Sequence, residues 1–325
     1  MQANEIAILN VNRSIPFLPR HVEHLQQIAP GSRIIIIDQP SDLAEKASAA
    51  DVLILWPHAV PDILAFFRDT ATLRWVHLFT SGVDSLVNSE AGNNPNYRIT
   101  STKGIHGYPI SDHVLAFIFT FLRQFHAAAA AQREHRWRFG ALSVDCREMA
   151  GLTVGIIGVG NIGLEVARKC KLLGMTVLGA KRHSIQNEWL DHCYAIDELD
   201  RLLEQADFVV LSLPLTDDSK QMIGRRELQA MKKSAILINI ARGGVVDQQA
   251  LIEALQSGEI AGAGLDVTDP EPLPPDNPLW DMPNVIITPH ISAQSPQYMD
   301  RAIEVIGENL RRFIADEPLL FEVKT

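Results

Sequence analysis

The sequence lacks most of the features that mark exported, membrane-bound or nucleic-acid-binding proteins. Its three cysteines, Cys146, Cys170 and Cys193, are odd in number and form no C-x-x-C pair, so we expect reduced thiols rather than a disulfide framework or a metal site. No run reaches the roughly 18 apolar residues of a membrane span, and the N-terminus has neither the basic nor the apolar region of an export signal. The net charge of −10 argues against a nucleic-acid surface. These absences predict a cytoplasmic protein without membrane, nucleic-acid or metal partners.

What the sequence does contain is an alternation of short apolar segments with segments of helical periodicity. Because β-α-β order favours parallel sheets, we predict an α/β fold of two doubly wound parallel-sheet domains. We expect 104–291 to form one domain, and 1–103 together with 292–325 to form a second, discontinuous domain. The expected strands are 6–9, 34–37, 52–55, 75–78, 154–157, 176–179, 208–213, 235–240, 263–267 and 285–288. The expected helices are 21–28, 41–49, 61–67, 110–131, 164–173, 199–205, 226–231, 248–257 and 293–313.

The segment 110–131 is long, apolar and rich in alanine, and it is predicted to be one helix that starts just after Pro109. Its five consecutive alanines, 127–131, leave a smooth surface that suits close helix packing. We expect this surface to act as a domain hinge or as a subunit interface. The basic and aromatic residues 133–139 are expected to form a solvated connection.

A glycine turn between a buried strand and a helix organises the chain. Gly158, Gly160 and Gly163 have the spacing G-x-G-x-x-G directly after the β-branched run 154–157. The first glycine permits the tight turn, the second lets a pyrophosphate approach the backbone, and the third allows the helix to pack closely on the strand. This context predicts a dinucleotide site at a helix N-terminus; the alternative is a glycine turn in another kind of α/β protein.

The residues at the end of the second strand indicate which coenzyme binds. An acidic residue is expected about 20 positions after the first glycine, where it would bind the ribose 2′-hydroxyl. This sequence instead has Ala180, followed by Lys181, Arg182, His183 and Ser184. A cation pair and a hydroxyl favour a 2′-phosphate, so we predict that NADPH is preferred over NADH. The alternative is that the two cations are merely solvated at a strand end.

Three polar residues follow three successive strands of the predicted coenzyme domain. Arg242 follows 235–240, Glu271 follows 263–267, and His290 follows 285–288. Because ligands bind at the carboxyl ends of parallel strands, these side chains are expected to converge beside the nicotinamide.

The chain resembles the D-isomer-specific 2-hydroxyacid dehydrogenase family in five stretches, 154–163, 231–247, 263–267, 271–274 and 288–291. The resemblance implies that 104–291 form a Rossmann dinucleotide-binding (coenzyme) domain and that 1–103 with 292–325 form a flavodoxin-like substrate domain. It also implies that Arg242, Glu271 and His290 are catalytic and that a homodimer forms through the coenzyme domain. It implies, more loosely, that Ser81, Gly82 and Val83 bind the substrate carboxylate together with Arg242. The expected coenzyme-binding residues are Gly158, Gly160, Asn161, Ile162, Gly163, Lys181, Arg182, Ser184, Leu213, Pro214, Ile240, Ala241, Asp266 and His290.

The chemistry of keto-acid reduction fits these residues. Negative charge develops on the carbonyl oxygen, so a proton donor of near-neutral pKa is needed, and histidine provides one. Glu271 would favour the imidazolium of His290, and Arg242 would bind the carboxylate and polarise the ketone. For Asp266, the resemblance implies a contact with the nicotinamide amide, whereas a turn-capping aspartate is the alternative. We expect His113, in the long helix, to be packed rather than catalytic.

We therefore predict NAD(P)H-dependent reduction of a 2-keto acid to a D-2-hydroxy acid, a reversible reaction. Two alternatives remain open at this point. The first is a phosphoglycerate-type dehydrogenase on the same scaffold. The second is a non-enzymatic binder in which coenzyme occupancy controls a partner. The sequence does not indicate the size of the pocket for the substrate's side chain, so it does not distinguish between short and aromatic keto acids.

Overall fold

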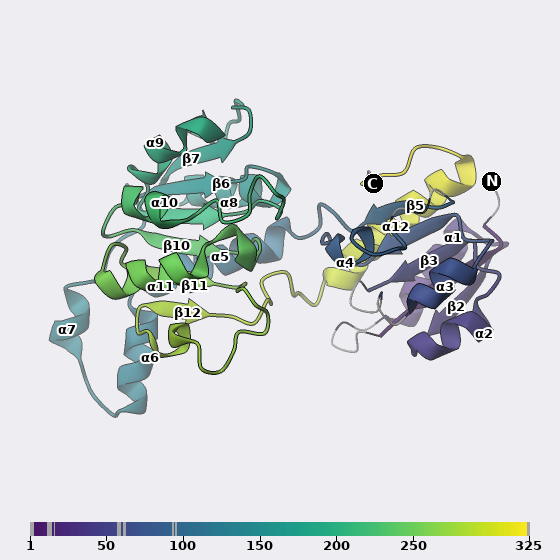
Figure 1. Cartoon of the computed structure of the whole chain (residues 1–325), viewed down its shortest axis with the longest axis horizontal. Helices are drawn as coiled ribbons and strands as arrows, with labels where there is room; N and C mark the ends of the chain where they lie inside the picture. Colours follow the sequence, from purple (N-terminus) through teal and green to yellow (C-terminus); the bar gives the residue numbers. More distant parts are fainter. Residues whose placement is uncertain are drawn as a thin grey trace. The chain divides into compact units, whose positions relative to one another are not determined.

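The computed structural model describes residues 3–11, 15, 17–56, 60, 63–92, 94 and 96–323. The chain divides into two compact units (Figure 1). Unit 1 comprises Met1–Ile105 and Ser295–Thr325, and unit 2 comprises His106–Gln294. Each unit contains one parallel sheet with helices on both faces, which confirms the predicted α/β fold class.

Unit 1 contains a five-stranded sheet whose order is that of flavodoxin-like proteins. Its strands, in sheet order, are β2 (Arg33–Ile37), β1 (Glu5–Leu9), β3 (Val52–Leu55), β4 (Trp75–Leu78) and β5 (Arg98–Ser101). Successive side chains of a strand face opposite sides, so Ile6 and Ile8 of β1 contribute to a different core cluster from Ala7 and Leu9. One cluster includes α1 (Pro19–Ile28) and α12 (Tyr298–Ala315), and the other includes α2 (Leu43–Lys46), α3 (Leu64–Asp69) and α4 (Asp84–Val87).

Unit 2 contains a seven-stranded sheet in the Rossmann order with one additional strand. Its strands, in sheet order, are β12 (Val285–Ile287), β11 (Gly262–Leu265), β10 (Ile236–Asn239), β9 (Phe208–Leu211), β6 (Thr153–Ile157), β7 (Thr176–Lys181) and β8 (His192–Ala195). One face packs against α5 (Gly107–Leu122) and α8 (Asn161–Leu172), and the other against α9 (Leu199–Leu203), α10 (Arg225–Ala230) and α11 (Gln248–Ser257). Strands buried on both faces explain why these segments are continuous apolar runs.

The prediction of one helix over 110–131 is wrong. The structure has two helices, α5 and α6 (Phe125–Arg133), whose axes bend by 66° at a short break. Gln124 adopts a left-handed conformation there, with φ of 55°, and its side-chain amide donates to the Phe121 carbonyl oxygen at 3.0 Å. A left-handed residue ends an α-helix because it turns the following carbonyl and N–H groups away from the helix axis.

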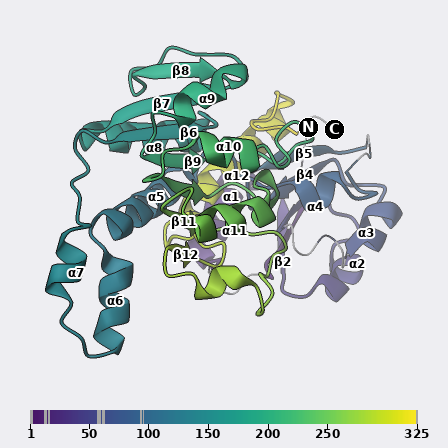
Figure 2. The ribbon, with the colours of Figure 1, turned by 60° about the vertical axis from the view of Figure 1, so that its left-hand side comes forward.

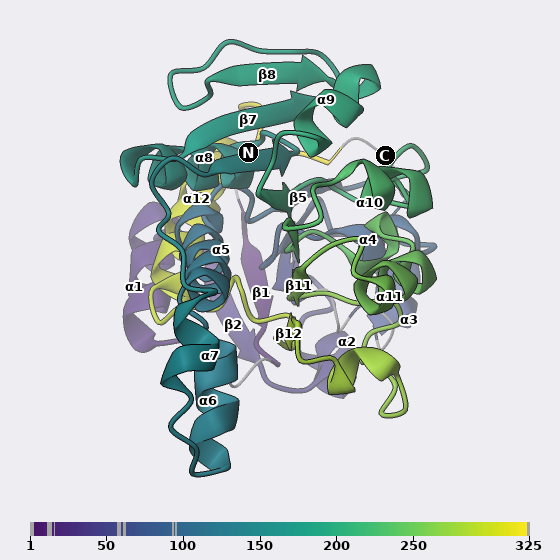
Figure 3. The same ribbon diagram turned by 90° about the vertical axis from the view of Figure 1, so that its left-hand side faces the viewer.

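Beyond the break, α6 and α7 (Phe139–Ser143) form an arm that projects from the rest of unit 2 (Figures 2 and 3). The connection over 133–139 is exposed as predicted, and Trp137 is 96% exposed. The apolar side chains of Phe125, Phe139 and Val144 are exposed as well.

Other differences from the predictions are local. The strands β5 and β8 were not predicted, and the expected helix 41–49 is a 3₁₀ turn, Pro40–Asp42, followed by the four-residue α2. The helix expected over 61–67 begins at residues outside the described part, and the structure has α3 in its place. Within the described ranges, no single helix is long and apolar enough to cross a membrane; only the bent pair α5 and α6 passes by length and composition together.

Candidate functional site

Six of the seven strands in unit 2 end next to residues that the sequence assigned to coenzyme binding or catalysis. Because all seven strands are parallel, these residues lie at one edge of the sheet, which we call the carboxyl edge. Along the chain they are Gly158 after β6, Lys181 at the end of β7, Leu213 after β9, Ile240 after β10, Asp266 after β11 and His290 after β12. This is the edge at which open α/β sheets bind ligands.

The glycine turn has the geometry that a dinucleotide requires. Gly158 has φ of 100°, and a Cβ there would lie 2.3 Å from the carbonyl oxygen of Ser212. A Cβ on Gly163 would lie 2.2 Å from the carbonyl oxygen of Gly158, so this glycine lets α8 pack against the turn. A Cβ on Gly160, in contrast, would meet nothing within 4 Å. The fold therefore requires two of the glycines, and the third leaves the N-terminus of α8 open to an anionic group.

Lys181, Arg182 and Ser184 are all exposed where β7 ends. The Arg182 guanidinium donates to Oδ2 of Asp218, in the loop after β9, at 2.8 Å, and both side chains are largely exposed. An exposed ion pair of this kind contributes only about 0–1 kcal/mol. The ion pair with Asp218 is therefore too weak to prevent Arg182 from binding a phosphate group.

His290 and Glu271 form a hydrogen-bonded pair at the carboxyl edge. Nδ1 of His290 donates to Oε2 of Glu271 at 2.9 Å, while Oε1 of Glu271 accepts the backbone N–H of Thr268 at 3.1 Å. The hydrogen bond to Glu271 raises the pKa of His290 above its ordinary value, although burial acts in the opposite direction. Burial raises the pKa of Glu271, but the hydrogen bond and charge of His290 outweigh it, so the pKa of Glu271 lies below its usual range. With Nδ1 held by Glu271, Nε2 is the ring nitrogen that is available to a ligand.

Arg242 lies between β10 and a 3₁₀ turn, Gly243–Val245, and is half-buried. A Cβ on Gly243 would lie 1.9 Å from the carbonyl oxygen of Thr268, so only glycine allows these two loops to approach so closely. The charge of Arg242 lowers the pKa of both Glu271 and His290, which places its guanidinium in their electrostatic environment. The structure thus gathers a guanidinium, a carboxylate and an imidazole at the carboxyl edge.

Asp266 holds the segment that carries His290. Its side chain is fully buried, and its Oδ1 accepts the hydroxyl of Thr288 at 2.6 Å and the backbone N–H of Ile291 at 2.9 Å. Oδ2 accepts the N–H of Ser292 at 3.0 Å. Burial raises the pKa of Asp266, but the hydrogen bonds from Ser292, Thr288 and Ile291 outweigh it and hold the pKa below its ordinary value. The turn-capping interaction considered for Asp266 is therefore present, and its contact with the nicotinamide stays a prediction.

Comparison with known proteins identifies the family. The model of the D-isomer specific 2-hydroxyacid dehydrogenase NAD-binding domain matches residues 115–292. The chain belongs to this family. A glyoxylate reductase of Korarchaeum cryptofilum is 36% identical over 289 residues, which cover 88% of this chain and 84% of the relative.

Two solved structures resemble this chain over nearly its whole length. A D-isomer specific 2-hydroxyacid dehydrogenase family protein of Aeromonas salmonicida superposes with a TM-score of 0.88 at 30% identity and covers 99% of both chains. An NADPH-dependent glyoxylate/hydroxypyruvate reductase of Sinorhizobium meliloti, in complex with NADP and sulfate, has a TM-score of 0.80 at 29% identity, over 99% of this chain and 98% of that one. The present chain is accordingly an oxidoreductase with a nicotinamide-coenzyme domain.

Sequence reasoning missed the side chains that support Asp266 in this dehydrogenase. Thr288 directly follows β12, and its hydroxyl also contacts Nε2 of His113 at 3.0 Å, across 175 positions of sequence. Ser292 is buried directly after the turn. The signal available in the sequence was the pattern Thr-Pro-His-Ile-Ser, in which two hydroxyl residues flank the strand-end histidine.

The remaining predicted residues occupy both units. Ser81, Gly82 and Val83 belong to unit 1, in the loop before α4, where the Thr80 hydroxyl donates to the carbonyl oxygen of Gly82 at 2.8 Å. Their role in binding the carboxylate stays a prediction. Near the glycine turn, Asn161 is exposed and Ile162 is half-buried; in the loops after β9 and β10, Leu213 is half-buried, Pro214 is exposed, and Ile240 and Ala241 are buried.

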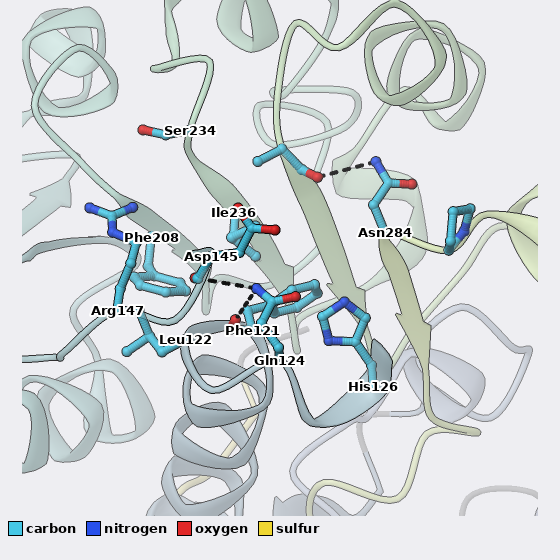
Figure 4. A pocket seen from close by; sticks show the side chains of 12 residues that line it. Phe121, Leu122, Gln124, His126, Asp145, Arg147, Phe208, Ser234, Ile236 and Asn284 are labelled. Carbon is cyan, nitrogen blue, oxygen red and sulfur yellow. Dashed lines mark hydrogen bonds between the residues drawn. The ribbon is translucent and has the colours of Figure 1, made fainter. Parts of the chain in front are cut away.

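A separate cavity of about 400 Å³ lies on the opposite side of unit 2, where β9 and β10 begin and where α5 ends (Figure 4). Gln124 and His126 line it from the helix break, and Asn284 lines it from the start of β12, where its amide donates to the carbonyl oxygen of Ala261. This cavity contains none of the residues assigned to the reaction. Among the residues that the structure describes, no cluster of three or more His, Cys, Asp or Glu side chains is arranged to hold a metal ion.

Proposed function

We propose that this dehydrogenase reduces a small 2-keto acid, of the glyoxylate or hydroxypyruvate kind, to a D-2-hydroxy acid with NADPH. The observation that carries the proposal is the hydrogen-bonded pair of His290 and Glu271 at the carboxyl edge, to which the glycine turn also belongs. The names of the Korarchaeum relative and the Sinorhizobium structure support glyoxylate and hydroxypyruvate as the first substrates to test.

The chain's residues divide the work of the reaction. When bound, the dihydronicotinamide supplies the hydride for the carbonyl carbon. His290 donates a proton from Nε2 to the carbonyl oxygen, and in the oxidation direction it accepts that proton. Glu271 keeps the imidazole protonated and fixes its orientation, while Arg242 binds the carboxylate and stabilises negative charge on the oxygen. The N–H groups of the Ser81–Val83 loop are proposed as a further carboxylate-binding element.

The same proposal includes a preference for NADPH over NADH. No acidic residue occupies 180–184, and Lys181, Arg182 and Ser184 present two cations and a hydroxyl instead. A charge-assisted hydrogen bond contributes about 1.5–3 kcal/mol, so one or two of them correspond to a preference of roughly tenfold to several hundredfold. Replacement of Arg182 by alanine should reduce kcat/KM with NADPH and leave kcat/KM with NADH nearly unchanged. The matched control is Arg201→Ala, which removes an exposed arginine of α9 that is likewise paired with a carboxylate, Glu198.

The test of the function is a substrate panel with both coenzymes. We expect reduction of glyoxylate and hydroxypyruvate, faster with NADPH, and a D-configured product wherever the product is chiral. Oxidation of phosphoglycerate without keto-acid reduction would show the alternative dehydrogenase. Tight coenzyme binding with no turnover on any substrate would show the coenzyme-sensing binder. An L-configured product would overturn the stereochemical part alone.

We also propose a homodimer that forms through the arm of unit 2. Phe125, Trp137 and Phe139 expose large apolar surfaces there, and the alanines of α6 leave room for close approach of another chain. Light scattering should give twice the mass of 36.0 kDa. Trp137→Asp should shift the mass towards that of the monomer, and a wild-type monomer would dismiss the proposal.

A further inference from the structure

A histidine of α5 ends a chain of hydrogen bonds that leads to the proton-transfer site. Nε2 of His113 lies 3.0 Å from the hydroxyl oxygen of Thr288, and that oxygen lies 2.6 Å from Oδ1 of Asp266. The His113 ring also packs edge-on against Phe117, at 4.8 Å between ring centroids, so α5 fixes its orientation. Side chains that lie 175 positions apart are thus joined in one network.

The direction of each hydrogen bond follows from the number of protons available. A carboxylate only accepts, so the single hydroxyl proton of Thr288 is donated to Asp266. The Thr288 oxygen must then accept a proton from Nε2 of His113. Burial lowers the pKa of His113 although the charge of Asp266 acts against it, so His113 is the neutral tautomer with its proton on Nε2.

The far end of the network supports the backbone around His290. This residue has φ of 52°, a left-handed conformation that is uncommon for residues other than glycine. Its N–H donates to the backbone carbonyl oxygen of Asp266 at 2.9 Å, and the Asp266 carboxylate accepts the N–H groups of Ile291 and Ser292. Asp266 is therefore the group that enforces the turn.

We propose that His113 is a positioning residue: it fixes the Thr288 hydroxyl, which orients Asp266, and Asp266 holds the turn that places His290 against Glu271. This inference rests on the proposed function, in which His290 exchanges the substrate proton. Nε2 of His113 lies 3.7 Å from Oδ1 of Asp266, which is too far for a hydrogen bond, and 3.0 Å from the Thr288 hydroxyl oxygen, so His113 acts on Asp266 through Thr288. The loss of one hydrogen bond from such a network corresponds to an effect of roughly twofold to tenfold.

Three replacements of His113 distinguish the effect of its N–H donor from the effect of its side-chain volume. His113→Leu keeps an apolar side chain against Phe117 and removes the donor. His113→Gln keeps an N–H donor near the position of Nε2, whereas the shorter His113→Asn keeps an amide that reaches only the position of Nδ1. We expect kcat for keto-acid reduction to fall roughly twofold to tenfold in the Leu and Asn variants, with KM and the melting temperature nearly unchanged, and to recover in the Gln variant.

The pKa of His290 distinguishes a positioning role of His113 from a purely structural one, because a purely structural role would leave this pKa unchanged. The charged groups that act on His290 are Glu271, Asp266 and Arg242, and none of them is altered in the His113 variants. A displaced His290 loses part of its hydrogen bond to Glu271, so its pKa should fall in His113→Leu. The change appears as a displacement of the falling limb of the kcat/KM profile to lower pH, and as a displaced imidazole titration by NMR.

A double-mutant cycle tests whether the effect passes through Thr288. Thr288→Val removes the hydroxyl at constant shape, and Thr288→Ser retains it as the matched control. If His113 acts through Thr288, then His113→Leu should have no further effect in the Thr288→Val background. Independent, multiplied effects would overturn the proposal, as would a His113→Leu variant that keeps both wild-type kcat and the wild-type titration of His290.

The NMR titration also separates the two proposals. A wild-type protein that reduces no keto acid contradicts the proposed function, but the titration of His290 still shows whether His113 controls its position. An active wild type with an unresponsive His290 contradicts only the role of His113.

Discussion

Asp51 and Asp207 hold corresponding positions in the two units. Asp51 precedes β3, and its Oδ2 accepts the N–H groups of Asn4 and Glu5, where the neighbouring β1 begins. Asp207 precedes β9, and its Oδ2 accepts the N–H of Thr153, where the neighbouring β6 begins. Both sheets thus use one aspartate to join the first strand to its central neighbour. The framework of a parallel sheet is shared, so the functional difference between the units must come from residues elsewhere.

Two histidines show that difference. His77 lies within β4 of unit 1, is 0% exposed, and contacts the hydroxyl oxygens of Thr100 and Thr102 at 2.7 and 3.2 Å. Burial lowers the pKa of His77 to about 3, so the ring is neutral. His290 lies beyond the end of β12, half exposed and paired with Glu271, and its pKa is raised. The sheet interior removes the charge of an imidazole, and the carboxyl edge stabilises it.

The strongest way to test this contrast is to remove His290. His290→Ala should lower turnover by about 10²–10⁴, because the proton donor is lost, while the coenzyme still binds through the glycine turn. Steady-state rates and fluorescence titration with NADPH measure the two effects. The surface replacement His192→Ala, on β8, is the control and should leave both unchanged. Turnover close to that of the wild type would assign the proton to another group.

Much of the contrast between the two histidines could be predicted from the sequence, because it depends on whether a residue lies within a strand or beyond its end. The β-branched runs identify the buried strands, and Arg242, Glu271 and His290 are recognisable as polar residues that follow them. In a parallel sheet, position in the chain therefore predicts position in space. The contact between His290 and Glu271 needed only the additional assumption that neighbouring strand ends converge.

The structural features that could not be predicted from the sequence depend on contacts between distant segments of the chain. The break at Gln124 interrupts a sequence without glycine or proline, so helix propensity alone continues the helix. The strands β5 and β8 are short and carry polar residues, so their pairing with β4 and β7 decides their conformation. The hydrogen bond between His113 and Thr288 joins residues 175 positions apart, and no local pattern encodes it.

The turn after the first strand is a second difference between the units, because only unit 2 has the G-x-G-x-x-G spacing. A Cβ on Gly160 meets no protein atom within 4 Å, so Gly160→Ala should fold normally and weaken NADPH binding by roughly tenfold to a hundredfold through contact with the pyrophosphate. Calorimetric titration and thermal unfolding measure the two effects. Gly163→Ala is the matched variant and should lower the melting temperature as well, because its Cβ meets the backbone of Gly158. Unchanged coenzyme affinity in Gly160→Ala would place the pyrophosphate elsewhere.

The buried histidine should make the stability of unit 1 depend on pH. The folded pKa of His77 is about 3 and its ordinary value is 6.5, so the stabilisation is complete above pH 6.5 and is lost as the pH falls towards 3. Between about pH 6.5 and pH 5 the free energy of unfolding should fall by about 1.6 kcal/mol, because the unfolded histidine is half protonated at pH 6.5 and the slope approaches about 1.4 kcal/mol per pH unit only at lower pH. Urea unfolding at several pH values measures the fall, and His77→Gln should flatten the dependence, whereas His192→Gln should not. A wild-type stability that stays constant over this range would contradict the neutral buried state.

The pairing of His290 with Glu271 can be weakened without removing either side chain. Glu271→Gln keeps a hydrogen-bond acceptor for Nδ1 but removes the negative charge, so the pKa of His290 should fall towards its ordinary value. Because the proposed reduction needs the protonated imidazole, kcat/KM should decline at lower pH than in the wild type. At pH values above the pKa of His290, kcat/KM should therefore be lower in Glu271→Gln than in the wild type, because a smaller fraction of the imidazole is protonated. At pH values below the pKa of His290 in both the wild type and the variant, kcat/KM of the two proteins should differ little. Assays at acidic pH are therefore the internal control. A loss of equal size at every pH would mean that Glu271 orients the ring without controlling its charge, and the electrostatic contrast between the two histidines would then depend on the burial of His77 alone.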